Sequence, residues 1–265
     1  MNDTFNLQRF GFLFKKTILE RPLQLIGIMA LALIATLTIF SFCVYFNHWH
    51  DGHIMSFTWG YLGGGIILSS VIFSYFNTNA SGSAYLTLPA SAFEKWLCGV
   101  LISGVLFTII FLLFFRLMDA AAVVIYHNSL DKTIANYNFL YNEAHIFEFD
   151  DKRIQFDYYI FLNFAGAALL GSLYFNKANF IKTTLVVIAV FAFVMGVNYL
   201  IARMFFMNQL NSAFPFLSVG LQMGNDYRMI NVSPEAEERF KACIKYVVPA
   251  ILWLTAYIRL REKEI

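Results

Sequence analysis

The chain has 265 residues, of which 59% are hydrophobic and only 14% are charged. Water-soluble domains carry about 25% charged residues, so this composition excludes an ordinary soluble domain. The formal net charge of +2 is too small to predict nucleic-acid binding.

Long uncharged runs recur from residue 23 to the end of the chain. A helix needs ~20 apolar residues to cross ~30 Å of hydrocarbon. Six runs predict an all-α membrane protein with six spanning helices, at about 23–46, 57–76, 97–118, 158–175, 183–202 and 242–260. Together the runs occupy most of the chain, so residues 1–265 are predicted to form a single transmembrane domain.

Lys and Arg are unevenly distributed between the two sides of this six-span topology. Short flanking segments rich in these cations stay in the cytoplasm. Segments on one side hold ten of the 19 Lys and Arg, namely Arg9, Lys15, Lys16, Arg21, Lys95, Lys177, Lys182, Arg259, Arg261 and Lys263. Both termini are therefore predicted to be cytoplasmic. The first run is too long for a signal peptide and is expected to remain as an anchor.

Residues 5–21, before the first run, have an amphipathic pattern. Apolar side chains recur at helical spacing on one face and charged side chains on another, which predicts an interfacial elbow helix. Its candidate functional residues are Arg9, Phe10, Phe14, Lys15 and Lys16. Two roles stay open for this helix, one as an element that moves with a partner and one as a surface anchor.

Three histidines, His48, His50 and His53, lie between the first two runs. Imidazoles bind zinc or copper, so these residues are weak candidates for metal ligands. Trp49 and Trp59 mark the same region as a membrane interface, which favours a polar interfacial turn without a metal. Replacing the three histidines by Gln is then expected to change little.

Small residues recur four apart inside the spans, at Gly60 and Gly64 and again at Ala167 and Gly171. This spacing lets helix backbones approach closely, so it predicts helix packing within or between protomers. Asn163 and Asn198 lie in apolar surroundings and are expected to form hydrogen bonds to neighbouring helices.

The segment between the second and third spans contains Ser91 and Glu94 at capping-box spacing. A helix is predicted to begin at Ala92 and to continue into the third span, after a rigid turn at Leu88 and Pro89. Such a rigid connection can transmit a push into the bilayer. We expect Phe93 and Trp96 to be apolar anchors for a partner, with Glu94 and Lys95 setting its register.

Two external loops carry secondary-structure signals of their own. Residues 146–156 alternate apolar and polar side chains on both sides of Asp150-Asp151-Lys152, which predicts a small β-hairpin between spans three and four. Residues 207–240 are expected to contain a helix that dips into the outer leaflet.

Enzymatic signatures are missing from the sequence. It contains no H-E-x-x-H, no nucleophile elbow and no Gly-x-x-x-x-Gly-Lys-Ser/Thr. We therefore expect neither an enzyme nor a cofactor, and ATP hydrolysis would require a second polypeptide. The lack of charged residues near the span centres argues against a proton- or sodium-coupled carrier.

The Leu-Pro-Ala-Ser-x-x-Glu-Lys stretch, the basic amphipathic lead-in, the six spans and the closing Arg-Leu-Arg-Glu-Lys-Glu resemble one protein family. This is the permease subunit of bacterial ATP-binding-cassette transporters of the type-two exporter class, especially forms found in Bacteroidetes. The likeness is sharpest around residues 86–97. The loop between spans three and four is longer than in that class.

The resemblance implies a multi-pass protein of the bacterial inner membrane. Its partners would be a separate ATP-binding-cassette ATPase, a second permease copy or paralogue and the lipid bilayer, with no nucleic acid. It assigns ATPase coupling to the elbow helix and to Leu88, Pro89, Ser91, Phe93, Glu94, Lys95 and Trp96. The alternative is a non-transporting scaffold or sensor that binds an external partner, and an external metal enzyme built on the three histidines ranks third.

Overall fold

The computed structural model describes residues 5–46, 49–134, 136–176, 178–206, 209–215, 217–223 and 226–264. Within these ranges, six helices are long and apolar enough to cross a membrane, as the sequence predicts. They are Pro22–Tyr45, Trp49–Val71, Ala92–Ser129, Lys152–Tyr174, Asn179–Phe206 and Pro234–Glu262. The second begins earlier than predicted, and the third ends later.

The first half of the chain contains the elbow helix and three of these long helices. In order its elements are α1 (Leu7–Glu20), α2 (Pro22–Tyr45), α3 (Trp49–Thr58), η1 (Trp59–Gly63), α4 (Gly64–Val71), η2 (Ser74–Asn77), α5 (Asn79–Leu86), α6 (Ala92–Val100), η3 (Leu101–Leu106), α7 (Phe107–Ser129) and α8 (Tyr137–Glu143). Helices α3, η1 and α4 are continuous, as are α6, η3 and α7. Both η1 and η3 are π-helical.

The second half contains α9 (Lys152–Tyr174), α10 (Asn179–Phe206), β1 (Leu210–Phe214), β2 (Ser218–Met223), β3 (Asp226–Asn231), α11 (Pro234–Ala242), the π-helical η5 (Cys243–Val247) and α12 (Val248–Glu262). The strands form an antiparallel sheet in the order β1-β2-β3. Val219 of β2 pairs with Ala213 on one side and with Ile230 on the other.

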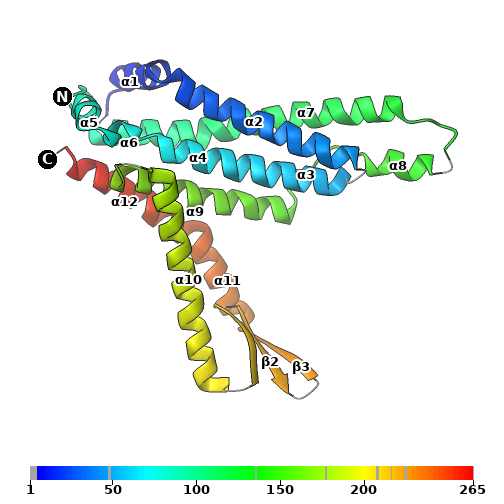
Figure 1. Ribbon diagram of the computed structural model, residues 1–265. Coiled ribbons are helices and arrows are strands. Elements are labelled where there is room, and N and C mark those ends of the chain that lie inside the picture. Colours follow the sequence, from blue (N-terminus) through cyan, green and yellow to red (C-terminus); the bar gives the residue numbers. More distant parts are fainter. Residues whose placement is uncertain are drawn as a thin grey trace.

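Helices α2, α3, α4, α7 and α9 run alongside one another in an elongated bundle (Figure 1). Helix α1 and the C-terminal end of α12 lie at one end of the bundle, whereas α8 lies at the other. Helix α10 points away from the bundle and has the sheet at its far end. We call the end with α1 the termini end and the end with α8 the distal end.

Small residues explain why the helices pack so closely. A side chain on Gly60 would overlap Thr36 of α2, and one on Gly64 would overlap Ala32. A side chain on Gly171 of α9 would overlap Thr183 of α10. The predicted small-residue spacing therefore serves packing inside one chain. The core that it closes is largely aromatic, and its fully buried aromatic members are Phe57, Tyr61, Phe73, Phe107, Phe111, Phe115 and Phe161.

The two buried-amide predictions have different outcomes. The Nδ2 atom of Asn163 donates to the carbonyl oxygen of Ile244 at 2.9 Å, which links α9 to η5 and confirms the expected interhelical bond. The Nδ2 atom of Asn198 has no hydrogen-bond partner within the described residues.

The β-hairpin predicted at 146–156 is wrong. Residues 145–148 have no regular structure, and α9 begins at Lys152 because the Asp151 side chain accepts a hydrogen bond from the backbone N–H of Arg153. Ile154, Asp157 and Phe161 are then buried at helical spacing. A short alternating pattern followed by a helix cap was mistaken for two strands.

The helix expected to dip into the outer leaflet within 207–240 is also wrong. The strands β1, β2 and β3 occupy half of this segment, and the helix that follows them, α11, is largely exposed and belongs to the last long helix. The segment is rich in the turn-forming residues Asn, Gly, Ser and Pro, and its apolar runs are too short for a helix of that kind.

Candidate functional site

The helix that begins at Ala92 is capped as the sequence predicts. The Ser91 hydroxyl accepts a hydrogen bond from the backbone N–H of Glu94, and the Glu94 carboxylate accepts one from the N–H of Ser91 at 2.9 Å. This capping box satisfies two donors at the helix start. The helix then continues through η3 into α7 without a break, so its first turn and the third span form one body.

The same carboxylate binds the elbow helix to this body. Glu94 is fully buried, and it accepts hydrogen bonds from the backbone N–H of Asn6 at 2.7 Å and from Nε and Nη2 of Arg9 at 2.7 and 2.9 Å. Charge-assisted bonds of this kind are roughly twice as strong as neutral ones. Two segments that are 85 residues apart in the sequence thus meet at one side chain.

The face of α1 that contacts the bundle includes most of the apolar face expected from helical spacing, Leu7, Phe10, Phe14 and Ile18, because the last three pack against the core. Leu13 and Thr17 are buried as well, whereas Leu7 is 74% exposed. Phe10 and Phe14 are half-buried against the core. Lys15 and Lys16 are exposed, beside the exposed apolar residues Phe12 and Leu19. Such a mixed outer face suits a head-group layer.

Lys95 connects the C-terminal end of the chain to the same place. Its Nζ atom donates to the carbonyl oxygen of Leu86 at 2.9 Å and to the Glu264 carboxylate at 2.8 Å. The side chain is only 1% exposed. Glu94 and Lys95 are therefore both engaged within the chain, and the expectation that they set the register of a partner is wrong.

The remaining residues of the predicted coupling segment are mostly internal too. The Trp96 indole donates from Nε1 to the carbonyl oxygen of Trp253 at 3.0 Å. Phe93 is half-buried, with ring centroids 5.8 Å from Trp96 and 6.2 Å from Tyr257. Leu88 is half-buried, whereas Pro89 is exposed.

The loop between the second and third long helices contains α5, and α5 forms the outward surface of this loop. The sequence reasoning missed this helix. Ala80, Ser83 and Ala84 are exposed on α5, and Thr87 is exposed directly after it. Its sequence signal is Thr78, whose side chain caps the helix by accepting a hydrogen bond from the N–H of Ser81. The outward face of α5 is uncharged and made of small side chains.

Aromatic stacking holds α5 in place. The ring of Tyr85 in α5 stacks on the ring of Tyr75 in η2 with centroids 4.4 Å apart. Burial, reinforced by the nearby Glu20 carboxylate, raises the pKa of Tyr75 to about 12, and burial raises the pKa of Tyr85 well above its usual value. Both phenols are neutral at physiological pH. The Arg21 guanidinium lies 3.6 Å from the centroid of the Tyr75 ring, which connects the end of α1 to the same stack.

The two described histidines of the candidate metal site, His50 and His53, lie in different environments. His48 lies outside the described residues, and His50 is exposed. His53 is 1% exposed, and its Nε2 atom lies 2.6 Å from Oδ1 of Asp119. The described residues contain no group of three or more His, Cys, Asp or Glu side chains that could hold a metal. The expectation of a wet interfacial turn is wrong for His53.

Asp119, which the sequence reasoning did not single out, organises the distal end. Its second oxygen, Oδ2, accepts a hydrogen bond from the backbone N–H of Phe147 at 2.8 Å. Arg116 donates to the carbonyl oxygen of the same residue at 2.9 Å. These bonds, together with the burial of the Phe147 side chain, hold the irregular segment after α8 against the bundle.

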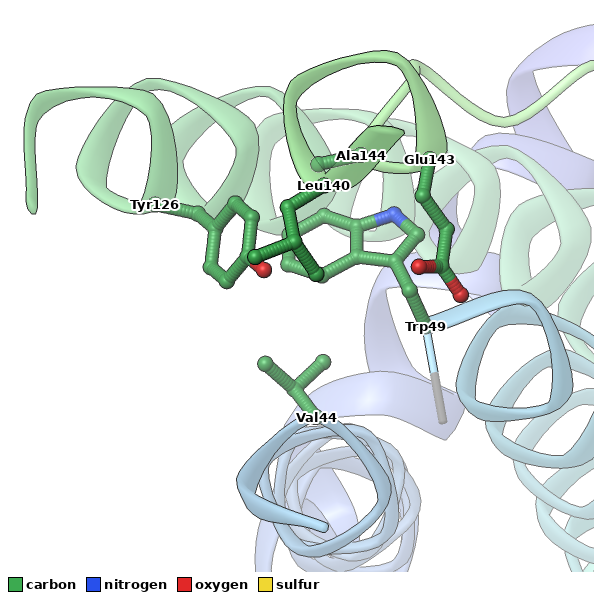
Figure 2. A pocket seen from close by; sticks show the side chains of 6 residues that line it. All are labelled: Val44, Trp49, Tyr126, Leu140, Glu143 and Ala144. Carbon is green, nitrogen blue, oxygen red and sulfur yellow. The ribbon is translucent and has the colours of Figure 1, made fainter. Parts of the chain in front are cut away.

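A small cavity of about 10 Å³ lies close to this region (Figure 2). Its lining consists of Val44, Trp49, Tyr126, Leu140, Glu143 and Ala144. A space of this size holds about one water molecule, which is too little for a substrate. Nε1 of Trp49 is buried and has no partner within the described part of the chain.

Comparison of the chain with known proteins gave no match to a protein-family model, to a curated protein or to a solved structure. The function proposed below therefore depends on the residues and on their geometry.

Proposed function

We propose that this protein is the membrane-spanning permease subunit of an ATP-binding-cassette exporter of the bacterial inner membrane, with the termini end in the cytoplasm. The observation that carries the proposal is the junction at Glu94. There the capped start of the third long helix binds the elbow helix, and the adjacent Lys95 binds the C-terminal end of the chain. A force applied at this junction acts on three parts of the membrane domain at once.

In this proposal a separate ATPase contacts α5. Helix α5 is exposed at the termini end. Its buried Tyr85 stacks on Tyr75 and lies under the Lys95 ammonium group, so α5 is in contact with the junction. The ATPase must be a second polypeptide, because the chain has no phosphate-binding loop. The residues 91–96 then transmit force inside the permease, while α5 makes the contact.

Helix α10 supports the assignment of a dimer. The most apolar stretch of 18 residues in α10 has a mean hydropathy of 2.5, yet only 6% of that stretch is buried within one chain. Lipid or a second copy must cover so much exposed apolar surface. A second permease copy against α10 agrees with a transporter that works as a pair of permeases and a pair of ATPases.

The test is co-purification of the ATPase encoded by the neighbouring reading frame. Ser83→Arg places a long cation on the exposed face of α5, and we expect it to reduce ATPase recovery about fivefold or more, since disturbing an interface centre costs ~1 kcal/mol or more. The matched control is Ser129→Arg. Ser129 is also an exposed helical serine bonded to its own helix backbone, but it is the last residue of α7, on the side of that helix from which the chain leads to α8.

Unchanged ATPase recovery with Ser83→Arg, at equal expression, contradicts contact through α5.

One observation favours the alternative of a scaffold or sensor. All six residues of β3 are exposed, so this edge strand is open to pairing with another protein. Co-purification of an external protein that is lost on deleting residues 226–231, with no ATPase recovered, supports the alternative.

A further inference from the structure

An apolar groove of about 510 Å³ lies between α7, α9 and α12. Its floor includes Tyr61 and Phe161, and its walls include Gly104, Thr108, Ala250 and Trp253. Two further lining residues, Val105 and Ile109, are 47% and 51% exposed, so the groove opens onto the outside of the bundle. All of its lining residues belong to long apolar helices, which places the groove at membrane depth in the proposed topology.

Three of the four polar side chains that line this groove, Tyr61, Thr108 and Trp253, already form hydrogen bonds. The Tyr61 and Thr108 hydroxyl oxygens lie 3.0 Å apart, and Thr108 donates to the carbonyl oxygen of Gly104 at 2.6 Å. The Trp253 indole donates to the carbonyl oxygen of Leu162 at 3.0 Å. None of the lining residues is charged. A polar ligand would therefore lose its hydrogen bonds to water and gain few in return, whereas a hydrocarbon has no such hydrogen bonds to lose.

The volume decides between two apolar occupants. A helix with side chains is ~10 Å across, so a helix filling this volume would be only about four residues long. A hydrocarbon chain ~5 Å across and ~15 Å long, the depth of one leaflet, occupies roughly 300 Å³. The groove thus has room for a lipid chain and is too small to enclose a partner helix. Sites of ~300–1,000 Å³ with mainly apolar walls are typical of small-molecule binding.

The backbone around the groove is unusual in the same way on three helices. Two of the three π-helical segments of the described chain contribute lining residues, and the third ends just before Pro249, a lining residue of α12. Tyr61 lies in η1, Gly104 lies in η3, and Pro249 and Ala250 come just after η5. Single π-helical turns are rare and often occur at functional sites, because the extra residue changes how side chains project. Their convergence here is an observation independent of the volume.

We propose that this groove binds one hydrocarbon chain of a membrane lipid and holds it more firmly than the lipid around the rest of the bundle. Because its walls are uncharged, the site selects the chain and ignores the charge of the head group. The inference does not rest on the permease proposal, and its test does not involve an ATPase, so either can fail without the other.

The test is photo-crosslinking in lipid nanodiscs, with phosphatidylglycerol and phosphatidylcholine probes that carry a diazirine in one acyl chain. Gly104→Leu puts a side chain into the groove, where a Cβ meets only Trp253, at an ordinary contact distance of 3.4 Å. Its matched control is Gly27→Leu on α2, where a Cβ has no neighbour within 4 Å. Ala250→Leu fills the groove from the opposite wall, which keeps the test valid if Gly104→Leu does not fold.

We expect adducts to concentrate on groove residues such as Thr108 and Trp253, equally with both head groups. Either groove-filling variant should reduce them several-fold, whereas Gly27→Leu should leave them unchanged. Adducts spread evenly over the outer faces of α2 and α10 would show annular lipid only and would overturn the proposal. Labelling by the anionic probe alone would overturn it as well, since that result requires a head-group site.

Discussion

At the scale of single residues, the buried acidic and basic side chains that the structure describes have partners from distant parts of the chain. Glu94 binds Arg9, Lys95 binds Glu264, and Asp119 binds His53. A buried ion pair is weak support for stability by itself, but removing one member leaves the other unpaired at a high cost. These residues consequently hold particular segments together at the two ends of the bundle.

His53 and His50 give a matched test of this view at the distal end. We expect His53→Gln to destabilise the fold by about 1–3 kcal/mol, because Gln cannot reproduce both the 2.6 Å bond to Asp119 and the ring packing against Phe40. His50→Gln should be nearly neutral, since His50 is exposed. The measurement is thermal unfolding in detergent micelles. Equal midpoints for the two variants would mean that the His53–Asp119 pair contributes little.

At the scale of the elements, glycines set the distance between α2 and the second long helix. Gly64 faces Ala32, whereas its neighbour Gly63 faces open space. The helical period places adjacent residues on different faces, so one glycine is required for packing and the other is not. The same logic joins α9 to α10 through Gly171 and Thr183.

The adjacent pair makes a sharp experiment. Gly64→Ala should destabilise the protein by about 1–3 kcal/mol, because the added methyl group overlaps a side chain that is itself packed between helices. Gly63→Ala should be neutral or stabilising by up to ~1 kcal/mol, as expected from helix propensity alone. Melting temperatures of the purified variants distinguish these outcomes. A loss of stability with Gly63→Ala equal to that with Gly64→Ala would contradict the role given to helix contact.

At the scale of the whole molecule, the two ends of the bundle differ in character. The termini end contains α1, α5 and the ion pairs of Glu94 and Lys95, whereas the distal end contains α8 and the loop held by Asp119. Helix α10 leaves the bundle and ends at the sheet (Figure 1). An even number of spans places both termini on one side of a membrane.

Cysteine-accessibility labelling tests this arrangement. In a variant without Cys43, Cys98 and Cys243, single cysteines at Ser83 and Lys263 should be protected from an impermeant reagent added outside intact cells. Cysteines at Asp131 and Asp226 should be labelled, because we expect the positive residues to retain the termini end in the cytoplasm. External labelling at position 263 would remove the sixth span and with it the permease assignment.

Local patterns in the sequence determined the six long apolar helices, the elbow helix and the capped start at Ala92. Hydropathy and capping act between residues a few positions apart, so one sequence is enough to predict them. The alternation at residues 146–156 misled because a few alternating residues also fit an irregular segment followed by a helix.

Only the tertiary structure decided the chemistry of the sites. Glu94 pairs with a residue 85 positions away and Asp119 with one 66 positions away, and no local pattern encodes such distances. The exposed face of α5 depends on which side of a short helix is covered, and the apolar groove depends on how α7, α9 and α12 pack together. Packing between distant segments sets these features, because burial and pairing are properties of the assembled bundle.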